Sequence, residues 1–161
     1  MMRRFPVIVI ILFIVVPAAS HAQNRADKKA VRDRFSGAWR LSWLEEPDAE
    51  GHVQKADCTG LLVYTRDGFM SVQVMFRSPQ SGTAAAPVQY TQGGYEASYG
   101  TYEINDAHTF TFHVQGALVR TLIGKNLKRV YEFSDKQLIV KSPDPNEHWR
   151  VAWERSAEGS H

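Results

Sequence analysis

FSGAWRLSWLEE, residues 35–46, decides the fold, because the chain changes its period there. Trp39, Leu41 and Trp43 alternate with polar residues, and side chains two apart along a strand point to the same face. The stretch therefore predicts a half-buried strand that begins just after a Gly-x-Trp opening. Its two indoles either fill a core or line a cavity.

The chain before this strand divides into two parts. Residues 1–22 combine two arginines, an apolar run over residues 7–16 that is short for a bilayer span, and small residues around a cleavage site after Ala22. This pattern predicts a signal peptide and hence an exported protein, periplasmic or secreted. An uncleaved N-terminal anchor is the alternative. Residues 23–36 have apolar residues at roughly helical spacing and predict a short helix.

Charge and cysteine content argue against two further classes of protein. The chain has 19 basic and 17 acidic residues, and loss of Arg3 and Arg4 with the signal peptide leaves a formally neutral chain. Without a basic stripe, a nucleic-acid partner is not expected. The one cysteine, Cys58, cannot form an internal disulfide and has no Cys/His signature around it. We expect a small buried side chain there.

Alternating segments separated by turn residues fill the rest of the chain. Asp67-Gly68, between two such segments, is the clearest hairpin turn. Residues 77–94 are rich in Ser, Gly, Ala, Pro and Gln, and they predict a long loop that is mobile or forms a lid. The predicted strands are 38–46, 57–65, 69–77, 98–104, 108–116, 126–133, 137–142 and 147–155.

Eight short antiparallel strands in sequence must hide their edges. Closure into an all-β, up-and-down barrel removes the edges, and a barrel of this size is either filled by side chains or shaped around one small ligand. We therefore expect one barrel domain over residues 37–156, followed by a tail at 157–161. A two-layer sandwich is the alternative.

Four stretches resemble the bacterial and fungal lipocalin-like domain family in their order and spacing. They cover nearly the whole chain after the predicted signal, and the first resembles the Gly-x-Trp opening of lipocalins. The resemblance implies a lipocalin-like barrel with a short N-terminal helix. The stretches are GAWRLSW from Gly37, TGLLVYTRDGFMSVQV from Thr59, YEASYGTYEIND from Tyr95, and TFHVQGALVRTLIGKNLKR from Thr111.

Two positions depart from the family pattern. Members often carry a His-His pair where this chain has Phe112-His113. They often carry Gly-x-x-Gln-x-Arg where this chain reads GKNLKR, with Leu127 in place of Gln. A function that relies on both imidazoles or on that amide is therefore not implied here.

The resemblance also implies an arginine from the last strand over the Gly-x-Trp indole. Strand parity places Arg155 on the face of Trp153 and Arg150 on the other face. The last strand runs antiparallel to the first when the barrel closes, so Arg155 is expected to stack on Trp39 as a structural plug. Such a cation–π contact stabilises by about 0.5–2 kcal/mol. Trp43, further along the first strand, would then face the cavity.

The sixth predicted strand carries the strongest polar candidate for a binding site. Leu127, Arg129, Tyr131 and Phe133 share a face that their apolar members mark as inward. A buried guanidinium needs a partner. Arg129 with Tyr131 could hold the carboxylate or other anionic head of an amphipathic ligand. Alternatively, Arg129 pairs with Glu103 or reaches solvent at the barrel mouth.

The imidazoles offer a weaker signal. His113 lies opposite Phe110 and Phe112, so it is outside if the phenylalanines face the lumen. A polar lumen would reverse this and make His113 a candidate base. Three other histidines lie at turns or strand starts without metal-ligand spacing, and we expect no metal and no cofactor. They are His52, His108 and His148.

Tyrosines cluster in the stretch YTQGGYEASYGTYE, which begins at Tyr90. Tyr99 and Tyr102 point to opposite faces of their strand, so at most one of them lines a pocket. Tyr95 is a candidate for the mouth beneath the loop. Aromatic packing around a barrel is the alternative for each ring.

Together these features predict a binding protein for a small hydrophobic or amphipathic molecule. Arg129 and Tyr131 would orient the ligand, with Tyr99 and His113 as further candidates. One alternative is an isomerase or cyclase that uses Arg129, Tyr131 and His113 as acid or base groups. Another is a packed barrel that acts as an envelope-interaction module. The predicted apolar walls are Trp43, Met70, Val72, Phe110 and Phe112.

Overall fold

The computed structural model describes residues 19–48, 50–77, 94–134 and 136–156. Outside these ranges lie residues 78–93 of the loop predicted over 77–94, including Tyr90, as well as the predicted tail and most of the predicted signal peptide. Within them are one α-helix, nine strands and a 3-10 turn. The elements are α1 (Ala19–Phe35), β1 (Gly37–Pro47), β2 (Val53–Lys55), β3 (Cys58–Tyr64), β4 (Phe69–Phe76), β5 (Tyr95–Ile104), β6 (Thr109–Ala117), η2 (Arg120–Leu122), β7 (Asn126–Phe133), β8 (Gln137–Lys141) and β9 (Arg150–Arg155).

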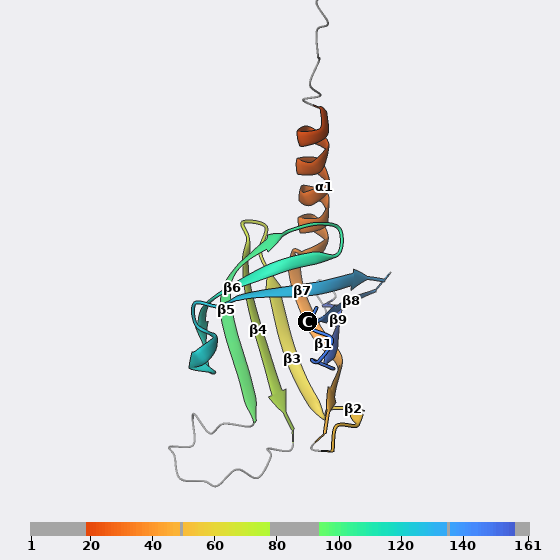
Figure 1. Ribbon diagram of the computed structural model, residues 1–161, viewed down its shortest axis with the longest axis vertical. Helices are drawn as coiled ribbons and strands as arrows, with labels where there is room; N and C mark the ends of the chain where they lie inside the picture. Colours follow the sequence, from red (N-terminus) through yellow and green to blue (C-terminus); the bar gives the residue numbers. More distant parts are fainter. Residues whose placement is uncertain (1–18, 49, 78–93, 135, 157–161) are drawn as a thin grey trace, which may run out of the picture.

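The strands form a closed up-and-down barrel, as predicted, and not a sandwich. Each strand from β3 to β9 pairs antiparallel with the next, β1 pairs with β3, and β9 returns to pair with β1. No prediction covered β2, a three-residue strand that extends the open end of the barrel by pairing with Glu45–Pro47. Figure 1 shows α1 at one end of the barrel and β2 at the other.

The predicted helix at the N-terminus is present, with different bounds. Residues 23–36 were expected to be helical, whereas α1 begins at Ala19 and ends at Phe35. The helix therefore continues across the predicted cleavage site after Ala22. In the part of the chain that the structure describes, no helix combines the length and the apolar character needed to cross a membrane.

The last residue of α1 plugs the barrel end that we call the closed end. Phe35 is fully buried, and the chain enters β1 directly after it. Edge-to-face rings gain stability beyond the area that they bury, so this cluster seals the barrel below the helix. The centroid of the Phe35 ring lies 4.8–5.9 Å from those of Tyr64, Tyr102, Phe110, Tyr131 and Phe133.

Arg155 and Gly37 explain why a Gly-x-Trp opening suits this junction. The Arg155 guanidinium lies 4.4 Å from the centroid of the Trp39 ring, as strand parity predicts, and donates hydrogen bonds to the carbonyls of Arg34 and Ser36. These are helix-end carbonyls that lack partners within the helix. Gly37 has φ +131°, and a Cβ there would lie 2.9 Å from Arg155 Nη1. Only glycine fits both constraints.

Candidate functional site

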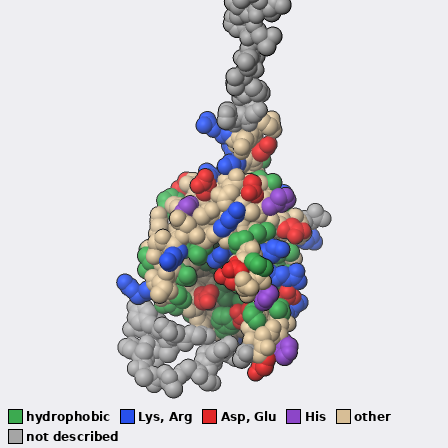
Figure 2. Space-filling model, viewed as in Figure 1, with side chains coloured by type: hydrophobic (Ala, Val, Ile, Leu, Met, Phe, Trp, Pro, Cys, Tyr) green, Lys and Arg blue, Asp and Glu red, His purple; other side chains and the backbone are tan. Residues whose placement is uncertain are grey.

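The barrel encloses a cavity of about 530 Å³, which we call the lumen. Its volume lies in the range typical of small-molecule pockets. Met70, Val72, Phe110 and Phe112 line it, as the sequence predicts, among other apolar side chains. The face in Figure 2 is hollowed, and hydrophobic and acidic side chains are visible inside the hollow. A packed barrel would leave no space of this kind, so the interior disagrees with the packed-module alternative.

Trp43 does not line the lumen, and a β-bulge is the reason. Leu41 pairs with Trp153 but Trp43 pairs with Ala152, so β1 gains one residue at Ser42 relative to β9. The inward face is therefore carried by Leu41 before the bulge and by other positions after it. Trp43 lies on the outer face, with its ring 5.2 Å from the Arg150 guanidinium.

Past the bulge, Leu44 and Glu46 face the lumen, and Glu45 points outward. The outward Glu45 carboxylate accepts a hydrogen bond from Arg150 Nε at 2.7 Å. Strict alternation from Trp39 would expose the apolar Leu44 to water and bury the charged Glu45. Because this placement is unfavourable for both side chains, it was the signal in the sequence that the strand contains a bulge.

Arg129 lines the lumen, as predicted, on β7. Burial lowers the pKa of its guanidinium, which is the effect expected when a charge loses water. Among the described residues no carboxylate forms a salt bridge with it, so the predicted alternative partner Glu103 does not serve. Nη1 donates to the Lys128 carbonyl at 3.0 Å, and most of the remaining donors have no acceptor among the described residues. The Glu147 carboxylate partly opposes the effect of burial on the Arg129 pKa without forming a salt bridge with it.

Trp149 holds Arg129 in place at the lumen wall. The guanidinium lies 5.1 Å from the centroid of the Trp149 ring. The indole N–H donates to Glu147 Oε2 at 3.1 Å, and hydrogen bonds from Ser142 and Trp149 lower the pKa of that carboxyl. Strand prediction placed residues 147–149 in the last strand, whereas β9 begins at Arg150. Trp149 therefore belongs to the connection that precedes β9.

Tyr131 does not join Arg129 in the lumen, and another tyrosine does. The Tyr131 ring packs on Phe35 in the closed end, where its hydroxyl donates to the Asp106 carbonyl at 3.0 Å. Tyr64 lines the lumen and is 2 % exposed. Burial raises the pKa of its phenol, and the nearby Arg129 charge opposes that rise. The phenol of the site is therefore that of Tyr64, which parity with the inward Leu62 could have indicated.

The Tyr64 hydroxyl has no hydrogen-bond partner among the described residues. No polar side-chain atom in those ranges is both sealed from solvent and unpaired. The hydroxyl of a residue that is only 2 % exposed must therefore open onto the lumen. It is free to donate to a guest molecule or to accept from one.

The lumen also receives two carboxylates that no prediction identified. Glu46, near the end of β1, and Glu96, near the start of β5, both line it. Burial raises the pKa of Glu46, and the Glu96 charge adds to this effect. A charged residue near a strand end is usually a solvated terminus, and only the bulge turns Glu46 inward.

Three further candidates lie outside the lumen. Tyr99 is 58 % exposed on the outer face, where its ring covers Gly116 so closely that a Cβ there would lie 2.3 Å from a ring carbon. His113 is also outside, as the inward phenylalanines predict, and its Nδ1 lies 2.7 Å from Asn126 Oδ1. Tyr95 lies on the outer face as well, with its hydroxyl donating to Gln73 at 2.8 Å.

The enzymatic alternative assigned acid or base roles to Arg129 and Tyr131, with His113 as a further candidate. The structure does not bring these side chains together: Arg129 lines the lumen, Tyr131 packs against Phe35 and His113 lies outside the barrel. Within the described ranges, no three His, Cys, Asp or Glu side chains gather as metal ligands would. Cys58 is buried, as expected, and burial raises the pKa of its thiol.

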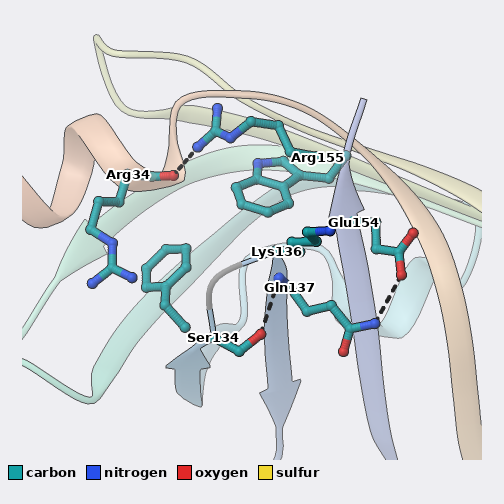
Figure 3. Close-up of a pocket in the computed structure, with 8 residues that line it drawn as sticks. Arg34, Ser134, Lys136, Gln137, Glu154 and Arg155 are labelled. Atoms are coloured by element: carbon teal, nitrogen blue, oxygen red, sulfur yellow. Dashed lines mark hydrogen bonds between the residues drawn. The ribbon is translucent and has the colours of Figure 1, made fainter. Parts of the chain in front are cut away.

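A second hollow of about 550 Å³ lies outside the closed end. Figure 3 shows Arg155 joined to the Arg34 carbonyl, and Gln137 joined to Glu154 and Ser134, by hydrogen bonds. The Arg34 guanidinium lies 4.2 Å from the centroid of the Phe133 ring. Arg155 and Arg34 link the end of α1 to the barrel, and Gln137, Glu154 and Ser134 bond to one another. The polar groups of this hollow are therefore paired within the protein, whereas the lumen has donors without an acceptor among the described residues.

Comparisons with known proteins agree with this architecture. The family model of the lipocalin-like domain matches residues 36–156. Comparison with curated proteins finds no match. A crystal structure of a lipocalin-like protein from Bacteroides uniformis has a TM-score of 0.45 at 14 % identity, covering 76 % of this chain and 98 % of that one. An uncharacterized protein from Bacteroides eggerthii has a TM-score of 0.45 at 15 % identity, covering 76 % and 99 %. Since the family model spans the whole barrel, the chain belongs to the lipocalin-like domain family.

Proposed function

We propose that this protein binds a small amphipathic molecule in its lumen, with an anionic head on Arg129 and Tyr64. The observation that carries the proposal is a pair of unpartnered donors inside an apolar cavity of about 530 Å³. Buried donors are almost always paired in folded proteins. A guest that accepts their hydrogen bonds would complete the set.

A carboxylate suits these donors better than a neutral group does. The planar guanidinium offers parallel N–H groups to two carboxylate oxygens, and the low dielectric of the lumen strengthens the contact. Trp149 fixes the plane of the Arg129 guanidinium, so little side-chain freedom is lost on binding. The apolar walls around Phe110 and Phe112 would take the hydrophobic body of the ligand.

The test compares one charge inside the lumen with one outside. Arg129→Met removes the guanidinium and keeps the length of the side chain. Lys128→Met removes an exposed charge from the next residue of β7 and serves as the matched control. The probes are a fluorescent polyene fatty acid and its methyl ester, which share the hydrophobic body and differ in the head.

Wild-type protein and the Lys128 variant should bind the acid more tightly than the ester. In the Arg129 variant the Kd for the acid should rise by about 10–100-fold, the range expected for losing a hydrogen-bonded charge pair. The Kd of this variant for the ester should stay within about threefold of the wild-type value, because the ester has no charge for Arg129 to bind. If the Arg129 variant binds the acid as tightly as wild-type protein does, Arg129 does not hold the anionic head and the proposal is wrong.

Export is the second part of the proposal. The basic start, apolar run and small residues of 1–22 support it. Mass spectrometry of the protein from its native host should give a chain that begins at Gln23. A chain that retains residues 1–22 would favour the uncleaved anchor.

A further inference from the structure

The lumen has a second polar region, formed by carboxylates at the open end. Glu46 lies near the end of β1, beside the short pairing with β2, and Glu96 lies near the start of β5. Both line the same cavity as Arg129 and Tyr64. The cavity therefore has groups of opposite character in two separate places along its length.

The two regions lie at different depths. Tyr64 ends β3, and its ring lies 4.9 Å from that of Phe35, the plug of the closed end. Glu46 instead pairs with Gln54 on β2, and the Ala56 N–H just before β3 donates to the Leu44 carbonyl at 2.9 Å, so Glu46 lies beyond the opposite end of that strand. Six residue steps along β3 separate that end from Tyr64, about 20 Å at the usual rise per residue.

No cation of the described chain neutralises the two carboxylates. Neither takes part in a salt bridge. Two cations at this end pair with other carboxylates: Arg77 with Asp57 at 2.9 Å, and Arg150 with Glu45 at 2.7 Å. A third, Lys55 on β2, has its Nζ 6.0 Å from the centroid of the outward-facing Trp43 ring. The sequence of residues 78–93 contains no Lys, Arg or His. Glu96 is exposed and Glu46 is half-buried, and burial together with the Glu96 charge raises the pKa of the Glu46 carboxyl. A cation held between the two carboxylates would relieve their repulsion.

The donors at the inner end are an independent indication of a guest. Tyr64 is 2 % exposed, has no partner among the described residues and opens onto this cavity. A guest that satisfied only Arg129 and Tyr64 would leave its far end against Glu46 and Glu96. The far end of the guest would therefore lie beside hydrogen-bond acceptors that carry negative charge. An alkyl terminus there would displace water from the carboxylates without giving them a hydrogen-bond donor.

We propose that the ligand is bipolar, with an apolar body, an anionic head on Arg129 and Tyr64, and a cationic amine on Glu46 and Glu96. This inference rests on the function proposed above and narrows it to amphipathic zwitterions. Glu46 and Glu96 become the specificity-determining residues, because they reward an ammonium group and reject a second carboxylate.

The experiment compares three ligands on one carbon skeleton: a linear fatty acid, its ω-amino acid and its α,ω-dicarboxylic acid, each with eight, ten and twelve carbons. Binding is measured by calorimetry at neutral pH. The test variant is Glu46→Gln with Glu96→Gln. The matched control is Glu103→Gln with Glu132→Gln, which removes two exposed carboxylates from the barrel and changes the net charge equally. Thermal unfolding of each variant checks that it is folded.

Wild-type protein and the control should bind the best ω-amino acid at least tenfold more tightly than the matching dicarboxylic acid. The test variant should reduce that ratio to about two or less, because the charge that discriminates the two ligands is gone. The proposal of a bipolar ligand is wrong if wild-type protein binds the two ligands equally well, or if the preference for the ω-amino acid persists in the test variant.

Failure of this inference is distinguishable from failure of the proposed function. If the simple fatty acid binds in an Arg129-dependent way while the amine brings no advantage, the anchor stands and the bipolar ligand falls. If none of the chain lengths of any ligand binds, the anchor itself is wrong and the inference falls with it.

Discussion

The closed end and the lumen of this barrel use the same residue types, tyrosine and arginine, with different hydrogen-bond partners. At the closed end, the hydroxyls of Tyr102 and Tyr131 donate to backbone carbonyls, and Arg155 donates to two helix-end carbonyls. In the lumen, most donors of Tyr64 and Arg129 have no acceptor among the described residues. The donors of the closed end therefore stabilise the fold, whereas those of the lumen are available to the proposed ligand. Substitutions at the closed end should change stability, and substitutions in the lumen should change binding.

The largest effect should come from removing the plug. Phe35→Ala deletes a fully buried ring at the centre of five aromatic contacts and should cost about 3–5 kcal/mol of unfolding free energy. Phe112→Ala removes a ring that borders the lumen and should cost roughly half as much, because one side of the ring already faces open space. Denaturant unfolding measures both. Equal losses of unfolding free energy would mean that the closed end and the lumen wall are packed equally well.

Arg155→Met should have the next largest effect. It removes the stacking on Trp39 and two hydrogen bonds to helix-end carbonyls, which together should cost about 2 kcal/mol and lower Tm by about 4–8 °C. Arg40→Met removes an exposed arginine from the same strand pair and should change Tm by less than about 2 °C. Ligand affinity should not change in either variant. Lost affinity in the Arg155 variant would show that the closed end also shapes the lumen.

The two kinds of tyrosine provide the sharpest contrast. Tyr131→Phe breaks the hydrogen bond to the Asp106 carbonyl and should cost about 1 kcal/mol. Tyr64→Phe breaks no hydrogen bond with a described residue, so stability should stay within about 0.5 kcal/mol while affinity for a fatty acid falls. Thermal unfolding and calorimetry separate the two outcomes. A large stability loss in the Tyr64 variant would assign its hydroxyl to the fold.

The smallest effect should come from Glu46, and its sign depends on pH. Because the pKa of this carboxyl is raised in the folded protein, folding disfavours its charged form. The cost is absent at low pH, where the folded and unfolded chains both carry the protonated form, and it appears as pH rises through the folded pKa. Glu46→Gln should therefore raise Tm by about 1–2 °C at pH 7 and leave it unchanged near pH 3.5. A gain that persists at the lower pH would assign the effect to packing.

The local sequence pattern was sufficient to predict the barrel and part of the lumen wall. Period-two alternation places Met70, Val72, Phe110 and Phe112 inward because their strands are regular over these positions. The same argument failed for Trp43, since one extra residue at Ser42 reverses every position that follows. A bulge is set by the pairing of two distant strands, and no single-strand pattern reports it directly.

Depth along the barrel was the second limit. Parity shows that Arg129 and Tyr131 share a face, and both do point inward. It does not show that α1 fills the space beside Tyr131, because the helix brings Phe35 to that ring from far away in the sequence. The phenol that shares the lumen with Arg129 instead comes from β3, across the barrel. Pairing between β3 and β4 sets the position of Tyr64 along the barrel axis, and the pattern of a single strand does not report it.

The bond between Arg155 and the end of α1 has a consequence for how the protein is made. Its two hydrogen bonds link Arg155 to carbonyls 119 and 121 positions earlier in the chain, so they cannot form until β9 has left the ribosome. Contacts of such long sequence separation slow folding and leave the preceding hairpins exposed meanwhile. A nascent chain that stops before β9 would lack both the strand that closes the barrel and the Arg155 hydrogen bonds to α1. Its sheet would stay open, with exposed edges that quality-control proteases can recognise.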